Sequence, residues 1–100
     1  MARTRIGLLR ITLSLPGARS LKDRRRVVRS LADRLRARCL VAVADTGDPA
    51  TRREAELSVV AVGLGTPAVH ARLDAARAIA IRAFPVEVTE AEIEWCELPQ

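Results

Sequence analysis

The chain has 100 residues, 49% hydrophobic and 29% charged, a balance that excludes a disordered chain and favours one globular domain over residues 1–100. Its net charge of +5 hides an asymmetry. Residues 1–38 carry 12 Lys or Arg against 2 Asp or Glu, whereas residues 39–100 carry 5 Arg against 10 Asp or Glu.

The N-terminal third predicts a strand followed by a helix. Residues 6–15 alternate between faces, which predicts a half-buried strand. Its expected buried face comprises Leu9, Ile11, Leu13 and Leu15. A helix is predicted over residues 20–38, because Ser20 can cap the first turn and Asp23 brings a negative charge to the positive end of the helix dipole. The expected buried face of this helix comprises Leu21, Val28, Leu31, Leu35 and Cys39.

The middle of the chain predicts two more strands, over residues 40–45 and 55–64. The connection between them is long for a hairpin and is a candidate functional loop. In the second of these strands, Leu57, Val59 and Ala61 can face the helices. The alternate residues are also apolar: Val60, Val62 and Leu64. A sheet that is apolar on both faces usually has a partner on its second face, so we expect a homodimer formed through the open face or an edge.

The last part predicts a helix and a strand. Thr66 is expected to be the N-cap, with Pro67 in the first helical position, and Pro85 ends the helix. The expected buried face comprises Val69, Leu73, Ala76, Ala80 and Phe84. Residues 86–98 alternate and predict a strand that breaks near Thr89. The resulting order, βαββαβ, indicates an α+β ferredoxin-like fold, a four-stranded antiparallel sheet with two helices on one face.

Positive charge gathers on one side of the first helix. At helical spacing, five cations form a stripe beside the expected buried face: Lys22, Arg25, Arg26, Arg29 and Arg36. Asp33 interrupts the stripe, which spans roughly 20 Å at a rise of about 1.5 Å per residue, a length that matches several phosphates. With Arg19 these are the candidate RNA-binding residues, and Arg52 and Arg53 are further candidates.

Three interpretations of the stripe remain open: a nucleic-acid site, an acidic protein partner, and a face that is solvated or paired within the chain. Dense blocks of one sign usually meet an oppositely charged partner, most commonly nucleic acid. Pairing within the chain would use the acidic final strand, which carries Glu90, Glu92, Glu94 and Glu97. The only aromatic residues, Phe84 and Trp95, lie off the two central strands, where RNA-recognition motifs stack bases. We therefore expect recognition of phosphates and shape in structured RNA, without stacking of single-stranded bases.

The sequence contains no pattern typical of catalysis, a metal site or a cofactor. His70 is the only histidine, and no cysteine or carboxylate pattern accompanies it. Asp45 and Asp48 flank a turn and are expected to serve it. Cys39 and Cys96 lie far apart without CxxC spacing, which argues against zinc and fits two reduced thiols in the cytoplasm. We expect a non-enzymatic, cytoplasmic protein with no cofactor, no metal and no membrane partner.

Two stretches resemble the YlxP-like family of small bacterial proteins, and the likeness covers essentially the whole chain. They are Pro16-Gly17-Ala18-Arg19-Ser20-Leu21-Lys22-Asp23-Arg24-Arg25 and Ala55-Glu56-Leu57-Ser58-Val59-Val60. The family motif covers Ser20, Leu21, Lys22, Arg24 and Arg25. The resemblance implies a ferredoxin-like fold, a cytoplasmic location and an unassigned biochemical function. Relatives tend to carry a Trp-Gln-Arg-like run before the third strand, where this chain has Arg52-Arg53-Glu54.

Members of that family are often encoded beside transcription-elongation and translation-initiation factors and ribosome-binding factor A, an association that directs attention to ribosomal RNA. The first hypothesis is therefore a non-enzymatic RNA- or ribosome-associated protein that binds structured RNA through the basic face of the first helix. The alternative is a homodimeric protein-interaction or scaffold domain without a nucleic-acid role, in which the basic and acidic halves pair.

Overall fold

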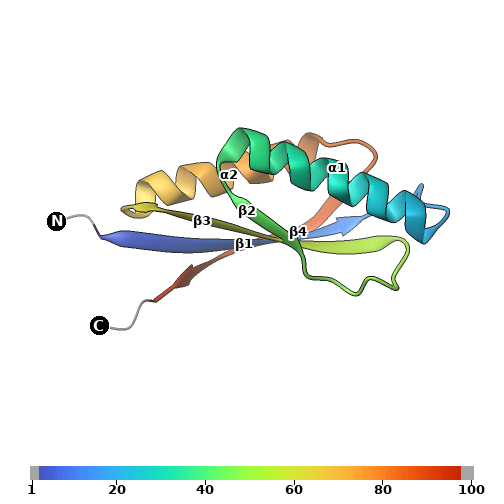
Figure 1. Ribbon diagram of the computed structural model, residues 1–100, viewed down its shortest axis with the longest axis horizontal. Helices are drawn as coiled ribbons and strands as arrows, with labels where there is room; N and C mark the ends of the chain where they lie inside the picture. Colours follow the sequence, from blue (N-terminus) through green and yellow to red (C-terminus); the bar gives the residue numbers. More distant parts are fainter. Residues whose placement is uncertain (1–2, 98–100) are drawn as a thin grey trace.

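The chain forms one sheet with two helices on one of its faces (Figure 1). The computed structural model describes residues 3–97. Its elements are β1 (Thr4–Ser14), α1 (Leu21–Cys39), β2 (Ala42–Asp45), β3 (Glu54–Leu64), α2 (Thr66–Arg82) and β4 (Glu87–Cys96). The strand order is β2-β3-β1-β4, and all neighbours are antiparallel. This arrangement confirms the predicted ferredoxin-like α+β fold.

The core lies between the helices and the two central strands. Alternate residues of β1 and β3 are buried and paired across the strands, as in Leu9 with Val59 and Ile11 with Leu57. These four side chains are 0% exposed. Full burial of such a side chain contributes roughly 1.5–3 kcal/mol, so this double row supplies much of the stability. The alternation predicted for both strands is confirmed.

The ends of α2 differ from the prediction. Gly65, with φ of 82°, is the N-cap, and Thr66 is the first helical residue, so Thr66 does not cap the helix. Glycine adopts this positive φ without a Cβ clash, which lets the chain turn directly from β3 into α2. Phe84, expected in the core, is 93% exposed, because the helix ends at Arg82 and the turn carries Phe84 away from the buried face. The other residues expected on that face are buried: Val69, Leu73, Ala76 and Ala80.

The predicted break in the last strand is a β-bulge. The register of β1 against β4 shifts between Thr12 and Leu13, which face Glu90 and Val88, so Thr89 is an extra residue in β4. The Thr89 hydroxyl donates to the Thr12 carbonyl at 3.3 Å. The end of the predicted strand, at residue 98, lies outside the described residues.

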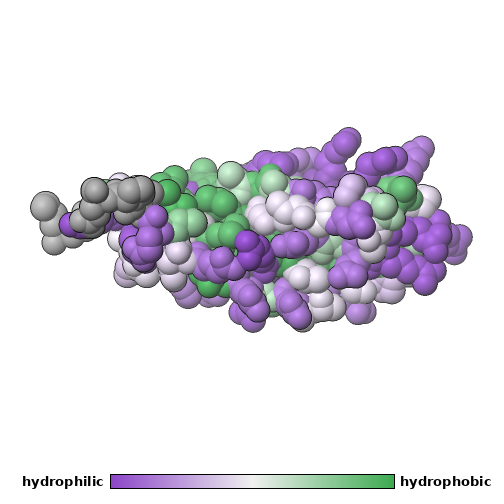
Figure 2. Space-filling model, turned by 90° about the horizontal axis from the view of Figure 1, so that it is seen from below, coloured by the Kyte–Doolittle hydropathy of each residue, from purple (hydrophilic) through white to green (hydrophobic). Residues whose placement is uncertain are grey.

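The second face of the sheet is uncovered by the other described elements, and Figure 2 shows apolar side chains gathered over one part of it. Strand alternation assigns to this apolar patch Ile6, Leu8, Val60, Val62 and Leu64. Val62 is 53% and Leu64 is 69% exposed. Among residues 3–97, the rest of this face carries glutamates of β3 and β4 around one cation, Arg10, which pairs with Glu56 and Glu94. The prediction that β3 is apolar on both faces is confirmed.

We expect Gly7→Ala to destabilise the fold by about 1–3 kcal/mol, because a Cβ at this position would overpack the contact between β1 and α2. That Cβ would lie 2.8 Å from Leu73 Cδ1 and 3.1 Å from Val69 Cγ1. Gly17→Ala is the matched control: Gly17 is exposed and its Cβ would meet nothing within 4 Å. Urea unfolding of both variants measures the difference, and equal midpoints would contradict the close approach at Gly7.

Candidate nucleic-acid interface

A capped first turn fixes the start of α1. The Ser20 Oγ accepts a hydrogen bond from the Asp23 N–H at 3.1 Å, and the Asp23 carboxylate accepts one from the Arg19 N–H at 3.0 Å. Both bonds satisfy backbone donors near the helix start, and the Asp23 charge lies at the positive end of the dipole. The Ser20 cap predicted from the sequence is confirmed.

One charged residue belongs to the buried side of α1. Val28, Leu31, Leu35 and Cys39 are buried as predicted. Leu21 is 39% exposed and does not join the core, whereas Arg24 is only 2% exposed. Arg24 lies four residues before Val28 and seven before Leu31, the spacing that defines one side of a helix. The helical spacing of Arg24 therefore indicated a buried position, but a charged residue was not expected on the buried side.

Arg24 ties α1 to both ends of the loop between β2 and β3. Its Nη1 lies 2.9 Å from Asp45 Oδ2, its Nη2 lies 3.4 Å from Asp45 Oδ1, and its Nε donates to the Glu54 carbonyl at 3.1 Å. Asp45 also accepts the Gly47 N–H at 3.2 Å, a local turn bond. The buried guanidinium thus has a charged partner and a backbone acceptor, as burial of a charge requires.

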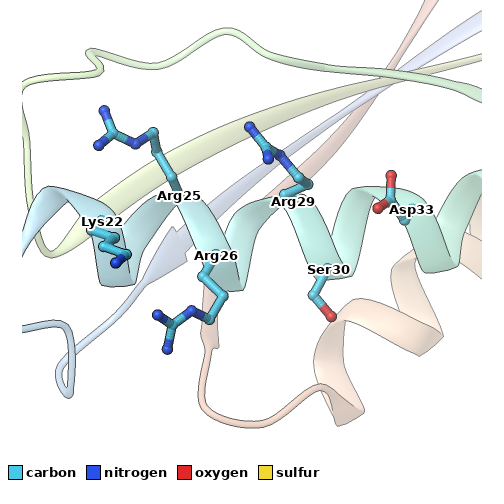
Figure 3. A pocket seen from close by; sticks show the side chains of 6 residues that line it. All are labelled: Lys22, Arg25, Arg26, Arg29, Ser30 and Asp33. Atoms are coloured by element: carbon cyan, nitrogen blue, oxygen red, sulfur yellow. The ribbon is translucent and has the colours of Figure 1, made fainter.

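Four of the predicted cations lie together on the exposed side of α1: Lys22, Arg25, Arg26 and Arg29. With Ser30 and Asp33 they surround an open hollow of about 520 Å³. Figure 3 shows two rows, with Arg25 and Arg29 extending to one side of the helix and Arg26 to the other. Since residues four apart share a helix side, the predicted single stripe is a pair of adjacent rows.

Arg36 is not a free end of this stripe. Its Nη1 donates to Asp33 Oδ1 at 3.0 Å, and its Nη2 donates to the Val43 carbonyl at 2.8 Å. Val43 lies in β2, an edge strand, so Arg36 occupies a carbonyl on that strand. Both bonds commit the Arg36 guanidinium to the fold, which separates it from the other predicted site residues.

Two further cations lie near the start of α1. Arg19 is exposed, and its carbonyl accepts a hydrogen bond from Arg52 Nη1 at 3.4 Å. Arg52 and its neighbour Arg53 are exposed in the loop before β3. The structure therefore brings Arg52, which is distant in sequence, to the N-terminal end of the stripe. Arg34, exposed on α1, was left out of the predicted set.

The acidic last strand does not pair with this stripe in the described residues. Glu94 pairs with Arg10 of β1, on the sheet face opposite the helices. Among residues 3–97, the salt bridges of α1 join Arg24 to Asp45 and Arg36 to Asp33. Lys22, Arg25, Arg26 and Arg29 have no carboxylate partner in this part of the chain, which leaves their charge available to an external anion.

The structure also places the side chains that the sequence offered as candidates for catalysis or metal binding. His70 is exposed on α2. Burial raises the pKa of the Cys39 thiol above its usual value, although the charges of Arg38 and Arg72 oppose the shift, so this thiol stays protonated at neutral pH. Within residues 3–97 no three His, Cys, Asp or Glu side chains could jointly hold a metal ion. Neither described helix has the length and apolarity needed to cross a membrane.

Comparison with known proteins shows a match to one protein family. The model of a family described as "Protein of unknown function (DUF503)" matches residues 6–93, which contain every element of the fold except the end of β4 and the first two residues of β1. No curated protein matches the chain.

We expect Arg24→Met to lower the free energy of unfolding by about 2–3 kcal/mol, because it leaves Asp45 and the Glu54 carbonyl without their donor. Arg25→Met is the matched control on the exposed side of the same helix and should change stability by less than about 0.5 kcal/mol. Thermal unfolding compares the two variants. If both melt together, the Arg24 contacts do not hold the loop to α1.

Proposed function

The chain belongs to the DUF503 family, and we propose that it is a non-enzymatic protein that binds structured RNA, such as ribosomal RNA, through the exposed cations of α1. The observation that carries the proposal is a set of exposed α1 cations without a carboxylate partner among residues 3–97: Lys22, Arg25, Arg26 and Arg29. Arginine suits this role because its planar guanidinium can hold two phosphate oxygens at once.

The geometry of α1 fits a phosphate backbone. Residues 22–29 cover about 10 Å of helix axis, and Arg19 and Arg52 extend the positive surface past the N-terminus of the helix. The positive end of the helix dipole lies at the same end. Two rows of cations on one helix suit RNA that is itself structured, because the phosphates of such RNA keep fixed spacings.

We further infer that this family member is a YlxP-like protein that acts in the cytoplasm. The support is the resemblance of residues 16–25 and 55–60 to that family, together with two free cysteines. The proposed ribosomal target follows from the genes beside which YlxP-like proteins are encoded, which include those of translation-initiation factors and ribosome-binding factor A.

A second candidate function rests on the apolar patch of the open sheet face. In this alternative the chain is a homodimeric interaction or scaffold domain, and a second copy covers Val60, Val62 and Leu64. A two-fold contact brings the same patch of both copies together, so an apolar patch meets an apolar patch. Burial would remove apolar surface from water at about 25 cal/mol per Å².

A triple Arg25→Glu, Arg26→Glu, Arg29→Glu variant tests the RNA site. We expect the wild type to bind structured ribosomal RNA with strong salt dependence, and each lost phosphate contact to flatten the log-affinity against log-salt slope by about 0.7–0.9. The variant should lose binding and melt near the wild type, because exposed charges contribute little to stability. Fluorescence binding between low and physiological salt provides the measurement.

The matched control is an Arg3→Glu, Arg77→Glu, Arg82→Glu variant, which makes the same change in net charge at exposed positions outside α1. It should retain most of the binding. Equal losses in both variants would mean that net charge, and not α1, attracts RNA. A wild type without salt-sensitive binding would leave the scaffold function as the remaining candidate.

Val62→Glu tests the dimer. We expect the wild type to dimerise in the micromolar range and this variant to be monomeric, because the dimer would bury an unpaired carboxylate. Ala78→Glu, an exposed change on α2, should leave the dimer intact. Sedimentation equilibrium distinguishes these outcomes, and a monomeric wild type across that concentration range argues decisively against the dimer.

A further inference from the structure

The only phenylalanine of the chain is almost fully exposed beside the basic helix. Phe84 lies in the turn between α2 and β4, and 93% of its surface is accessible. A single exposed apolar residue is ordinary on a protein surface. Phe84 is not isolated, however, because it forms one wall of a hollow whose other wall is α1.

This hollow has an apolar lining and a charged rim. Its volume is about 200 Å³, and its apolar lining includes Val27 and Leu31 of α1 and Val86 from the turn. Leu31 is 2% and Val86 is 7% exposed, so the fold holds this lining in place. Since sites for drug-sized ligands occupy roughly 300–1,000 Å³, this one suits a single flat ring system.

Two arginines border the same hollow. Arg26 and Arg34 line it from α1, eight residues apart, and neither has a carboxylate partner among residues 3–97. Arg26 also lines the larger hollow between the cations of the stripe. The apolar hollow is therefore continuous with the surface that we propose holds phosphates.

These features together specify an occupant that is flat and apolar at one end and anionic at the other. We infer that one unpaired base of the bound RNA stacks on Phe84 in this hollow while Arg26 and Arg34 hold its flanking phosphates. The Ser30 hydroxyl, which also lines the hollow, supplies a polar partner for the base edge. The inference rests on the proposed function and narrows its target to structured RNA with an extruded or bulged base.

The inferred site would stack a base without aromatic residues on the central strands, and it thereby departs from the expectation that RNA is recognised through phosphates and shape alone. Aromatic stacking needs an accessible ring face beside a path for the backbone, and it does not need a sheet. Phe84 provides the ring, and the rows of cations on α1 provide the path. The acidic open face of the sheet would instead repel the phosphates.

The test uses two RNA hairpins that differ only in one bulged 2-aminopurine, a fluorescent adenine analogue. We expect the wild type to bind the bulged hairpin more tightly and to quench its fluorescence. Phe84→Ala should weaken this binding roughly 5- to 150-fold, the range for loss of one base-stacking aromatic, and abolish the quenching. It should leave the fully paired hairpin unaffected. Phe84→Trp should restore both signals.

Ile81→Ala is the matched control, since Ile81 is an apolar α2 residue with 51% of its surface exposed, and it should behave as the wild type. Equal affinity of the wild type for both hairpins, or an unchanged Phe84→Ala variant, overturns the inference while salt-sensitive binding still upholds the proposed function. Absence of salt-sensitive binding to either hairpin overturns both. An aspartate-rich peptide provides a competitor for the hollow. If this peptide displaces the bulged base from the wild type, and the Phe84→Ala variant no longer binds the peptide, the hollow would instead be assigned to an acidic protein segment.

Discussion

Burial of Val28, Leu31 and Leu35 in the core fixes the rotation of α1 about its own axis. A helix residue cannot change its angular position without moving all the others, so this apolar contact also decides which side chains face water. The rows that contain Arg25 and Arg26 are exposed for that reason. The location of the positive surface is thus a result of core packing on the other side of the same helix.

Arg24 adds an ionic anchor to this apolar contact. Its guanidinium reaches from the buried side of α1 to Asp45 at the end of β2 and to the Glu54 carbonyl at the start of β3. The intervening loop has its own local bonds, including the Ala50 N–H to Asp48 Oδ1 at 2.9 Å. This confirms the turn role expected for Asp48. A loop held in this way can keep Arg52 close to the N-terminus of α1.

The sequence predicted every strand and helix, because each apolar pattern agreed with the turn and cap residues beside it. The sequence misplaced individual side chains where the end of a helix or the reach of a long side chain decides the contacts. Phe84 had the right spacing for the core, but its helix stops two residues earlier. Arg36 had the right spacing for the stripe, but its reach allows it to bond Val43 on β2. Helical periodicity gives a side chain's direction and not its partner.

Arg24 was missed for a different reason. Its spacing to Val28 and Leu31 is that of the buried side, but the ion pair that makes its burial tolerable joins residues that are 21 apart in sequence. Such a partner becomes visible only when the strand order is known. The hollow beside Phe84 has the same origin, since it forms between α1 and a turn that follows α2.

The two faces of the molecule carry opposite charge, with the arginines of α1 above the helical layer and the glutamates of β3 and β4 on the open sheet face. This separation gives the domain a permanent electric dipole moment directed from the open sheet face toward the helices. In the field of a polyanion the domain would rotate during approach and arrive helix side first. The apolar patch with Val62 and Leu64 would then point outward, away from the polyanion, and remain open to a different molecule.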